Sequence, residues 1–241
     1  MSGLEPRWEM RARHAEYMLL ALAAFAGIAL LLWAGRLMGV GLDFSDDGYY
    51  LNVNRNPALY SYSVTQFGFL YNPIFQAVGW DVALFRQVGL ALTSGLAAVL
   101  VALLTRRTTA SWPQAVLAGL VFAPVSLTLF YMWLPTPGYN SLGFQGLLLA
   151  GIALLLTEGE GKATWLGWVL LGVAGWIVFM AKPTSAAGAW TAGSRIPACG
   201  TPSADPRGCG RRGDGRRHPG GLGFGHRWQH RRLRAAPFDR R

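Results

Sequence analysis

Two adjacent carboxylates, Asp46 and Asp47, are the residues of this chain that are best placed for chemistry. They follow the first long apolar segment and precede Gly48, where the backbone can turn tightly. One carboxylate of such a pair can act as a general base toward a hydroxyl nucleophile, while the other orients the acceptor or a bound ion. The alternative is an ordinary solvated loop. We predict no metal site and leave a divalent cation open, because two adjacent carboxylates without a nearby His do not by themselves fix one.

The elements that position the pair are predicted to be membrane helices. Of the 241 residues, 52% are hydrophobic and 14% are charged, a composition that is rare in soluble domains. The apolar residues form segments long enough to cross a bilayer. The pattern therefore predicts an all-α fold, a polytopic transmembrane helix bundle. The five predicted spans are residues 17–35, 88–104, 115–134, 142–156 and 165–181.

Two of these spans have special features. The first is predicted to be a retained signal anchor rather than a cleaved signal peptide, because its apolar run exceeds a normal signal core and no Ala-x-Ala cleavage site follows it. The third contains Pro124, which a membrane helix tolerates where neighbouring helices satisfy the freed carbonyl.

The basic residues near the span ends predict that the N-terminal segment 1–16 lies in the cytoplasm. With this orientation, six basic residues lie inside and four lie outside. The loop 36–87, the turn 135–140 and the segment after residue 181 are then all extracytoplasmic. We interpret their polar residues as parts of one site. The alternative is that polar residues simply occur at span ends and that odd-numbered connections always share a side.

The loop 36–87 is rich in aromatic residues. Residues 44–80 contain ten of the thirty aromatic residues of the chain. Tyr and Trp favour the headgroup layer of a bilayer, so the loop is predicted to form short helices that lie along the membrane surface. The aromatic side chains either anchor the loop or also form the walls of an entrance for a polyprenyl or acyl chain, and the two interpretations are compatible.

The order of these features resembles that of the GT-C class of membrane-integral glycosyltransferases. The matching features are the basic N-terminus, the first span, the early acidic pair, the surface helices, the Pro-x-Tyr-Asn turn at 137–140 and the Lys-Pro-Thr helix end at 182–184. Within the class, residues 15–188 are similar to bacterial relatives of protein O-mannosyltransferases and lipid A aminoarabinose transferases. The resemblance implies inverting transfer of a sugar from a polyprenyl-phosphate carrier to a hydroxyl or phosphate acceptor. It also implies that Asp46 is the catalytic base and Asp47 its partner.

The resemblance gives the other polar residues of the outer face possible roles. A carrier phosphate needs a cation, for which Lys182, Arg86 and Arg55 are the candidates. Ordinary snorkelling at a helix end explains Lys182 and Arg86 equally well. Tyr139 and Asn140 could bind a sugar, brace the acidic loop or cap the next helix. No cofactor is implied, and the expected location is a bacterial plasma membrane, where membrane lipids surround the multi-pass domain 17–188.

The segment 189–241 differs from the rest of the chain in composition. It holds twelve Arg, three Asp and no Lys, so its net charge is +9, whereas residues 1–188 have a net charge of +1. Low apolar content predicts a disordered tail. The family enzymes are longer and continue into further spans, and we interpret the segment as a frameshift or truncation product of a GC-rich gene. On this interpretation the chain is an incomplete copy whose activity is in doubt.

Two other interpretations of this tail are weaker. A basic arm would suit nucleic acid or anionic lipid, but the predicted orientation puts the tail outside, where such charge is disfavoured and nucleic acid is not an expected partner. A zinc site fails because the two cysteines are ten residues apart rather than in a close pair. The residues considered for it are Cys199, Cys209, His218, His226 and His230.

Two classes of function stay open for the membrane domain. One is an enzyme, a lipid-linked sugar transferase with Asp46 as base. The other is a non-catalytic polytopic membrane protein, either a transporter fragment or an anchoring subunit. A transporter would place acids near the middle of its spans, whereas every predicted span core here lacks charge. This observation favours the transferase.

Overall fold

A computed structural model describes residues 7–41, 46–108, 111–130, 135–159, 161–184 and 186–187, which all belong to one compact unit. The described part is all-helical, as predicted. Its elements are α1 (Arg7–Leu37), α2 (Asp46–Arg55), the 3-10 helix η1 (Pro57–Tyr60), α3 (Phe67–Ala77), α4 (Val82–Thr108), α5 (Trp112–Phe122), the 3-10 segment η2 (Ala123–Phe130), α6 (Tyr139–Thr157) and α7 (Lys162–Ala181). The predicted tail, 189–241, lies outside the described residues.

Four described helices, α1, α4, α6 and α7, are long and apolar enough to cross a membrane, which supports the predicted polytopic membrane fold. Each contains one predicted span and extends beyond it. The span predicted at 88–104, for example, lies within a helix of 27 residues. Apolar residues define the part of a helix that could fit a bilayer, but basic residues such as Arg106 and Arg107 also favour helix and continue α4 beyond the apolar segment.

The third predicted span, 115–134, differs from a continuous membrane helix. The α-helix α5 ends at Phe122 after 11 residues, and η2 continues as a 3-10 segment. Pro124 explains the break, because it has no N–H and its ring clashes with the carbonyl of the residue four positions earlier, Leu120. Gly27 of α1 packs against this place: a Cβ atom there would lie 2.9 Å from the Leu120 carbonyl oxygen and 3.2 Å from Pro124 Cγ. Residues 131–134 lie outside the described part.

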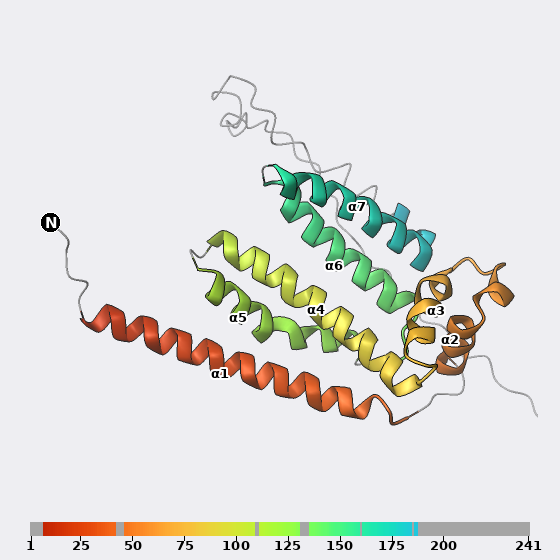
Figure 1. The fold of residues 1–241 in the computed structure, drawn as a ribbon, viewed down its shortest axis with the longest axis horizontal. Coiled ribbons are helices and arrows are strands. Elements are labelled where there is room, and N and C mark those ends of the chain that lie inside the picture. Colours follow the sequence, from red (N-terminus) through yellow and green to blue (C-terminus); the bar gives the residue numbers. More distant parts are fainter. Residues whose placement is uncertain are drawn as a thin grey trace, which may run out of the picture. The chain divides into compact units, whose positions relative to one another are not determined.

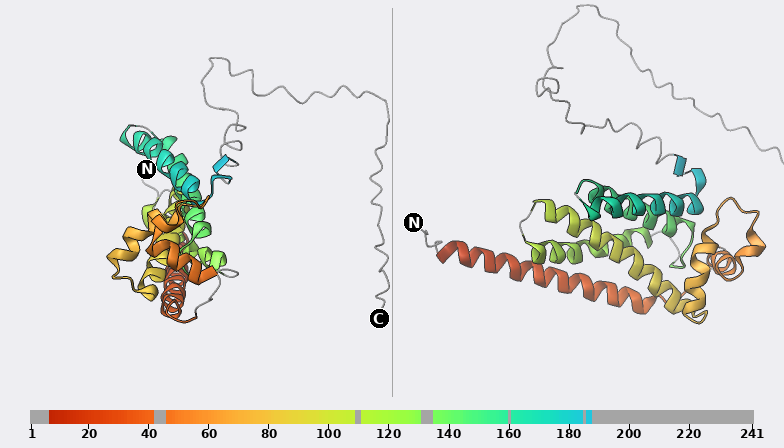
Figure 2. Two further views of the ribbon diagram at one scale, coloured as in Figure 1. Left: turned by 90° about the vertical axis from the view of Figure 1, so that its right-hand side faces the viewer. Right: turned by 45° about the horizontal axis from the view of Figure 1, so that its top comes forward.

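The long helices pack side by side, with α4 between α5 and α6 (Figure 1). Helix α7 packs on α6, and α1 packs on α5. Small residues allow close approach at these contacts, as is usual between membrane helices. A Cβ atom at Gly146 of α6 would lie 2.6 Å from Val178 Cγ2 of α7, for example. As Figures 1 and 2 show, α1 ends, α4 and α6 begin, and α7 ends at the same end of the bundle.

The short helices of the loop 36–87 lie at that end (Figure 2). Their buried side chains form a hydrophobic core together with residues of α4, α6 and α7. The inner aromatic residues do not face a membrane, because Phe67, Tyr71 and Phe85 are fully buried. Phe85 stacks on Phe75 with ring centroids 4.5 Å apart and meets Tyr71 edge-on at 5.9 Å. The same core includes Leu142 of α6 and Ala181 of α7. The loop is therefore docked onto the bundle, and its outer apolar side chains, which include Leu59, Tyr62, Val64 and Phe69, are exposed.

Candidate functional site

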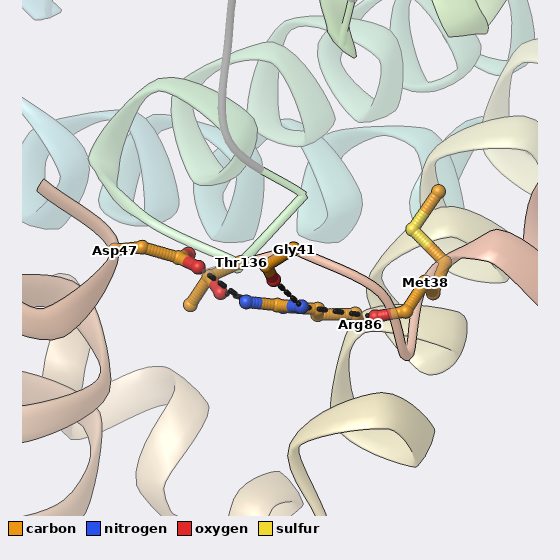
Figure 3. A network of polar contacts seen from close by, with 5 residues as sticks. All are labelled: Met38, Gly41, Asp47, Arg86 and Thr136. Atoms are coloured by element: carbon orange, nitrogen blue, oxygen red, sulfur yellow. Dashed lines mark hydrogen bonds and ion pairs between the residues drawn. The ribbon is translucent and has the colours of Figure 1, made fainter. Parts of the chain in front are cut away.

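Arg86 of α4 connects three segments at this end of the bundle (Figure 3). Its Nη2 forms an ion pair with the carboxylate of Asp47 in α2. Its Nε donates to Thr136 Oγ1 at 2.9 Å, and its Nη1 donates to the carbonyls of Met38 and Gly41 at 3.0 and 2.9 Å. The guanidinium therefore joins the end of α1, the start of α2 and the turn that precedes α6.

The Asp47–Arg86 pair is buried, and this explains why it has so many partners. The two side chains are 1% and 2% exposed. A charge that leaves water is tolerated only where an opposite charge and further hydrogen bonds replace the lost solvation. Four partners surround the guanidinium, and the carboxylate also lies in the first turn of α2, where the helix dipole favours an acid. A direct contact of Arg86 with a carrier phosphate would require these partners to be released.

Asp46, the other member of the acidic pair, is exposed. Adjacent residues of an α-helix point about 100° apart, so burial of Asp47 turns Asp46 away from the Arg86 network. Tyr49, three residues further on, is also exposed and shares the outer face of α2. Its ring meets Tyr60 of η1 edge-on at 5.7 Å. Asp46 is therefore the carboxylate of the pair that a molecule in solution can reach.

The buried face of α2 packs on the turn that begins α6. Asn54 Nδ2 donates to the carbonyl of Pro137 at 2.7 Å. Tyr50 packs against Gly138, where an added Cβ atom would lie 3.0 Å from the tyrosine ring. Residues 47, 50 and 54 occupy one face of the helix because their spacing follows the helical period. The turn is thus held at three successive points, through Arg86, Tyr50 and Asn54.

Tyr139 and Asn140 begin α6, and both are half-buried. Tyr139 packs edge-on against Tyr50 with ring centroids 5.8 Å apart. Burial and the hydrogen bond to Tyr139 raise the pKa of Tyr50 above its ordinary value. Neither Tyr139 nor Asn140 provides the cap of the helix: Ser141 Oγ accepts from the Gly138 N–H at 2.9 Å. Tyr139 thus contacts the acidic helix α2 through Tyr50, and its proposed role in binding or bracing stays a prediction.

Arg55 and Lys182, the other two basic candidates, are both exposed. Arg55 ends α2, and its guanidinium lies 5.8 Å from the ring centroid of Trp80. Lys182 follows α7, and its N–H donates to the Val178 carbonyl at 2.9 Å. The start of α3 is bonded to the end of α7 through Gln66, so Lys182 lies at the same end of the bundle as α2 and α3. Both side chains are accessible to an anion, in contrast to Arg86.

Two oxygen atoms on the buried face of α2 have no hydrogen-bond partner among the described residues. They are Asp47 Oδ1 and Asn54 Oδ1. Buried acceptors are rarely left unpaired, so each can accept a hydrogen bond from water or from a bound hydroxyl. Within the described ranges, no group of three or more His, Cys, Asp and Glu residues could hold a metal ion.

The structure brings the Asp46–Asp47 pair, Arg86, the 135–140 turn and the end of α7 to one end of the bundle, an arrangement that both the shared-site interpretation and its alternative predict. The predicted set did not include Thr136, Tyr50 and Asn54, through which Arg86 and α2 contact the turn before α6. A prediction of α-helix for residues 46–55 would have identified two of them, because Tyr50 and Asn54 then lie on the same helix face as Asp47. Nothing in the sequence near Thr136 indicates its contact with Arg86.

No protein-family model, no curated protein and no solved structure matches this chain. The resemblance to the GT-C class therefore stays a prediction that depends on the order of the motifs in the sequence. Apart from this order, the geometry of the site is what bears on function.

Proposed function

We propose that this chain carries the acceptor-activating site of a membrane-integral glycosyltransferase, which transfers a sugar from a polyprenyl-phosphate carrier to an extracytoplasmic acceptor. The observation that supports the proposal best is the division between the two adjacent acids. Asp47 is buried and paired with Arg86, whereas Asp46 is exposed at the same site. One carboxylate thus fixes the helix, and the other is presented to a substrate.

In the proposed reaction, Asp46 acts as general base. Its carboxylate accepts the proton of an acceptor hydroxyl while the hydroxyl oxygen forms a bond to the anomeric carbon of the sugar. The bond between that carbon and the carrier phosphate breaks, and its electron pair leaves with the phosphate. Attack opposite the leaving group inverts the anomeric centre. The carboxylate must come within about 2.6–3.2 Å of the hydroxyl, so the orientation of α2 controls the rate.

Arg86 has a positioning role in this proposal. It holds α2 through Asp47 and holds the turn before α6 through Thr136, so the two sides of the site keep a fixed separation. The carrier phosphate is instead assigned to the exposed cations Arg55 and Lys182, which can pair with an anion without losing a protein partner in the interior. Asn140, half-buried at the start of α6, is the candidate for contact with the sugar.

The proposal places the protein in a bacterial plasma membrane, with its N-terminus in the cytoplasm and the acidic helix outside. This orientation follows the distribution of basic residues. The site would then face the side on which lipid-linked sugars are consumed by the enzymes that the chain resembles.

The test is the substitution Asp46→Asn in the full chain, expressed in bacterial cells whose extracytoplasmic glycolipids and glycoproteins are examined by mass spectrometry. We expect cells with the unchanged chain to gain a product that is heavier by one sugar, and Asp46→Asn to lower its amount by roughly 10²–10⁴-fold. Asp81→Asn is the matched control, because Asp81 is also exposed and caps α4 through a bond that Asn can replace. Equal product from Asp46→Asn and Asp81→Asn would remove the base assignment. No product from the unchanged chain would favour either an incomplete, inactive copy or a non-catalytic membrane protein.

A further inference from the structure

A groove lies between α1, α4 and α5, apart from the contacts of the acidic pair. Its volume is about 530 Å³, within the usual range for small-molecule sites. The walls are mainly aliphatic. They are formed by Ile28, Leu31 and Leu32 of α1, Leu90 and Ala98 of α4, and Leu120 of α5.

The groove is elongated along α4. The residues of α4 that line it run from Gln87 to Ala98 at helical spacing, so they form one face of the helix. Eleven steps along an α-helix cover roughly 16 Å, at about 1.5 Å per residue. This is close to half of the hydrocarbon core of a bilayer, which is about 30 Å thick. The groove therefore has about the length of the acyl chains in one leaflet.

The groove is polar at only one end. Arg36, in the last turn of α1, is exposed there beside Gln87, whose Nε2 donates to the Gly35 carbonyl at 3.1 Å. Ser94 also lines the groove, but its hydroxyl is bonded to Ser126 at 2.8 Å. The lining residues include a cation and no acid. An apolar length that ends at a cation is complementary to a lipid with an anionic headgroup.

We propose that this groove binds one acyl chain of an anionic phospholipid, with the lipid phosphate paired to Arg36. The site is independent of the glycosyltransferase proposal, because none of the residues assigned to that reaction lines the groove. A phospholipid fits better than the carrier lipid, since a polyprenyl chain is longer than one leaflet. Binding would fill the space that separates α1 from α4 and would hold the two helices at a fixed distance.

Gly95 offers a direct way to block the groove. It lines the groove, and a Cβ atom added to it would meet no atom within 4 Å. The substitution Gly95→Leu therefore places an apolar side chain in the groove, and its Cβ atom fits without a close contact. Gly175→Leu is the matched control: Gly175 also lies in a membrane helix with open space around it, but on α7 and outside the groove.

The full chain is reconstituted in phosphatidylcholine vesicles that contain a minority of phosphatidylglycerol. The protein is then released from the vesicles, and the lipids that stay bound to it are identified by native mass spectrometry. We expect the unchanged protein to retain phosphatidylglycerol in preference to phosphatidylcholine. Arg36→Gln should lower this preference about fivefold, as expected for one basic residue at a membrane surface. Lys162→Gln removes an exposed basic residue at a helix end outside the groove and should leave the preference unchanged. Gly95→Leu should abolish retention, and Gly175→Leu should not.

Several results would overturn the proposal. They are equal retention of the two phospholipids by the unchanged protein, equal retention by Gly95→Leu and Gly175→Leu, and retention of an added polyprenyl phosphate in place of phosphatidylglycerol. A dimer that excludes lipid from the groove would overturn it as well. Helix content by circular dichroism checks that each variant is folded. If Gly95→Leu does not fold, the comparison of Arg36→Gln with Lys162→Gln decides the outcome, because both positions are exposed.

Discussion

Asp47 and Arg86 form an ion pair in the protein interior although 39 positions separate them in the sequence. The acid begins α2 and the base lies near the start of α4, so the pair fixes the loop helix to the bundle. It also changes the roles expected at the site. One member of the acidic pair and one candidate phosphate ligand are bound to each other, while Asp46, Arg55 and Lys182 stay accessible.

Arg86→Gln should destabilise the protein by about 3–5 kcal/mol, because it leaves the buried carboxylate of Asp47 without its partner. The measurement is the free energy of unfolding in detergent micelles, followed by circular dichroism. Arg107→Gln is the control. Arg107 pairs with Glu158 in an exposed ion pair, so its loss should cost about 1 kcal/mol or less. Similar losses at the two positions would contradict the structural role of the buried pair.

Gly89→Ala should destabilise the packing of the turn against α4. A Cβ atom at Gly89 would lie 2.7 Å from Pro137 Cγ, so either the turn or the helix must shift, at a cost of about 1–3 kcal/mol. Gly172→Ala of α7 meets no atom within 4 Å, and alanine favours a helix more than glycine does. We expect this control to be neutral or stabilising in the same unfolding measurement. An unchanged stability of Gly89→Ala would show that the turn is not tightly packed.

Stability should fall at alkaline pH, partly because of Tyr50. Burial raises the pKa of Tyr50 in the folded protein above its value near 10 in the unfolded chain. Below about pH 10 the phenol is neutral in both states, and above it the unfolded state loses the proton first, so the unfolding free energy decreases by up to about 1.4 kcal/mol per pH unit. Tyr50→Phe should reduce this slope above about pH 10. The same slope in both proteins would exclude Tyr50 as a cause.

The orientation can be tested with single cysteines, after Cys199 and Cys209 have been replaced by serine. Tyr62, in the loop 36–87, is 83% exposed, and Lys162 is exposed at the opposite end of α7 from the site. Tyr62→Cys in intact cells should react with a maleimide that does not cross membranes. Lys162→Cys should react only after the cells are permeabilised. The reverse pattern would place the acidic helix in the cytoplasm and contradict the proposed source of sugar.

Hydropathy was sufficient to predict the all-α fold and the positions of four long helices, because a bilayer imposes length and apolar character on each span separately. It did not predict the end of α5 at Phe122, although Pro124 lies in the predicted span. An α-helix continues past a proline only where neighbouring helices donate hydrogen bonds to the freed carbonyl, and the sequence does not show this. The role of Arg86 was also beyond prediction. A basic residue near a helix end looks the same in sequence whether it reaches for the headgroups or turns inward, and here Met38, Gly41 and Thr136 decide the direction.

The partners of Arg86 also set an order of assembly during synthesis. Met38, Gly41 and Asp47 leave the ribosome before Arg86, so three of its four partners are present once α4 has been made. Thr136 follows 50 positions later and is needed for the last bond. The acidic helix can therefore dock early, but its surroundings become complete only when the third connection emerges and folds back onto helices that are already inserted.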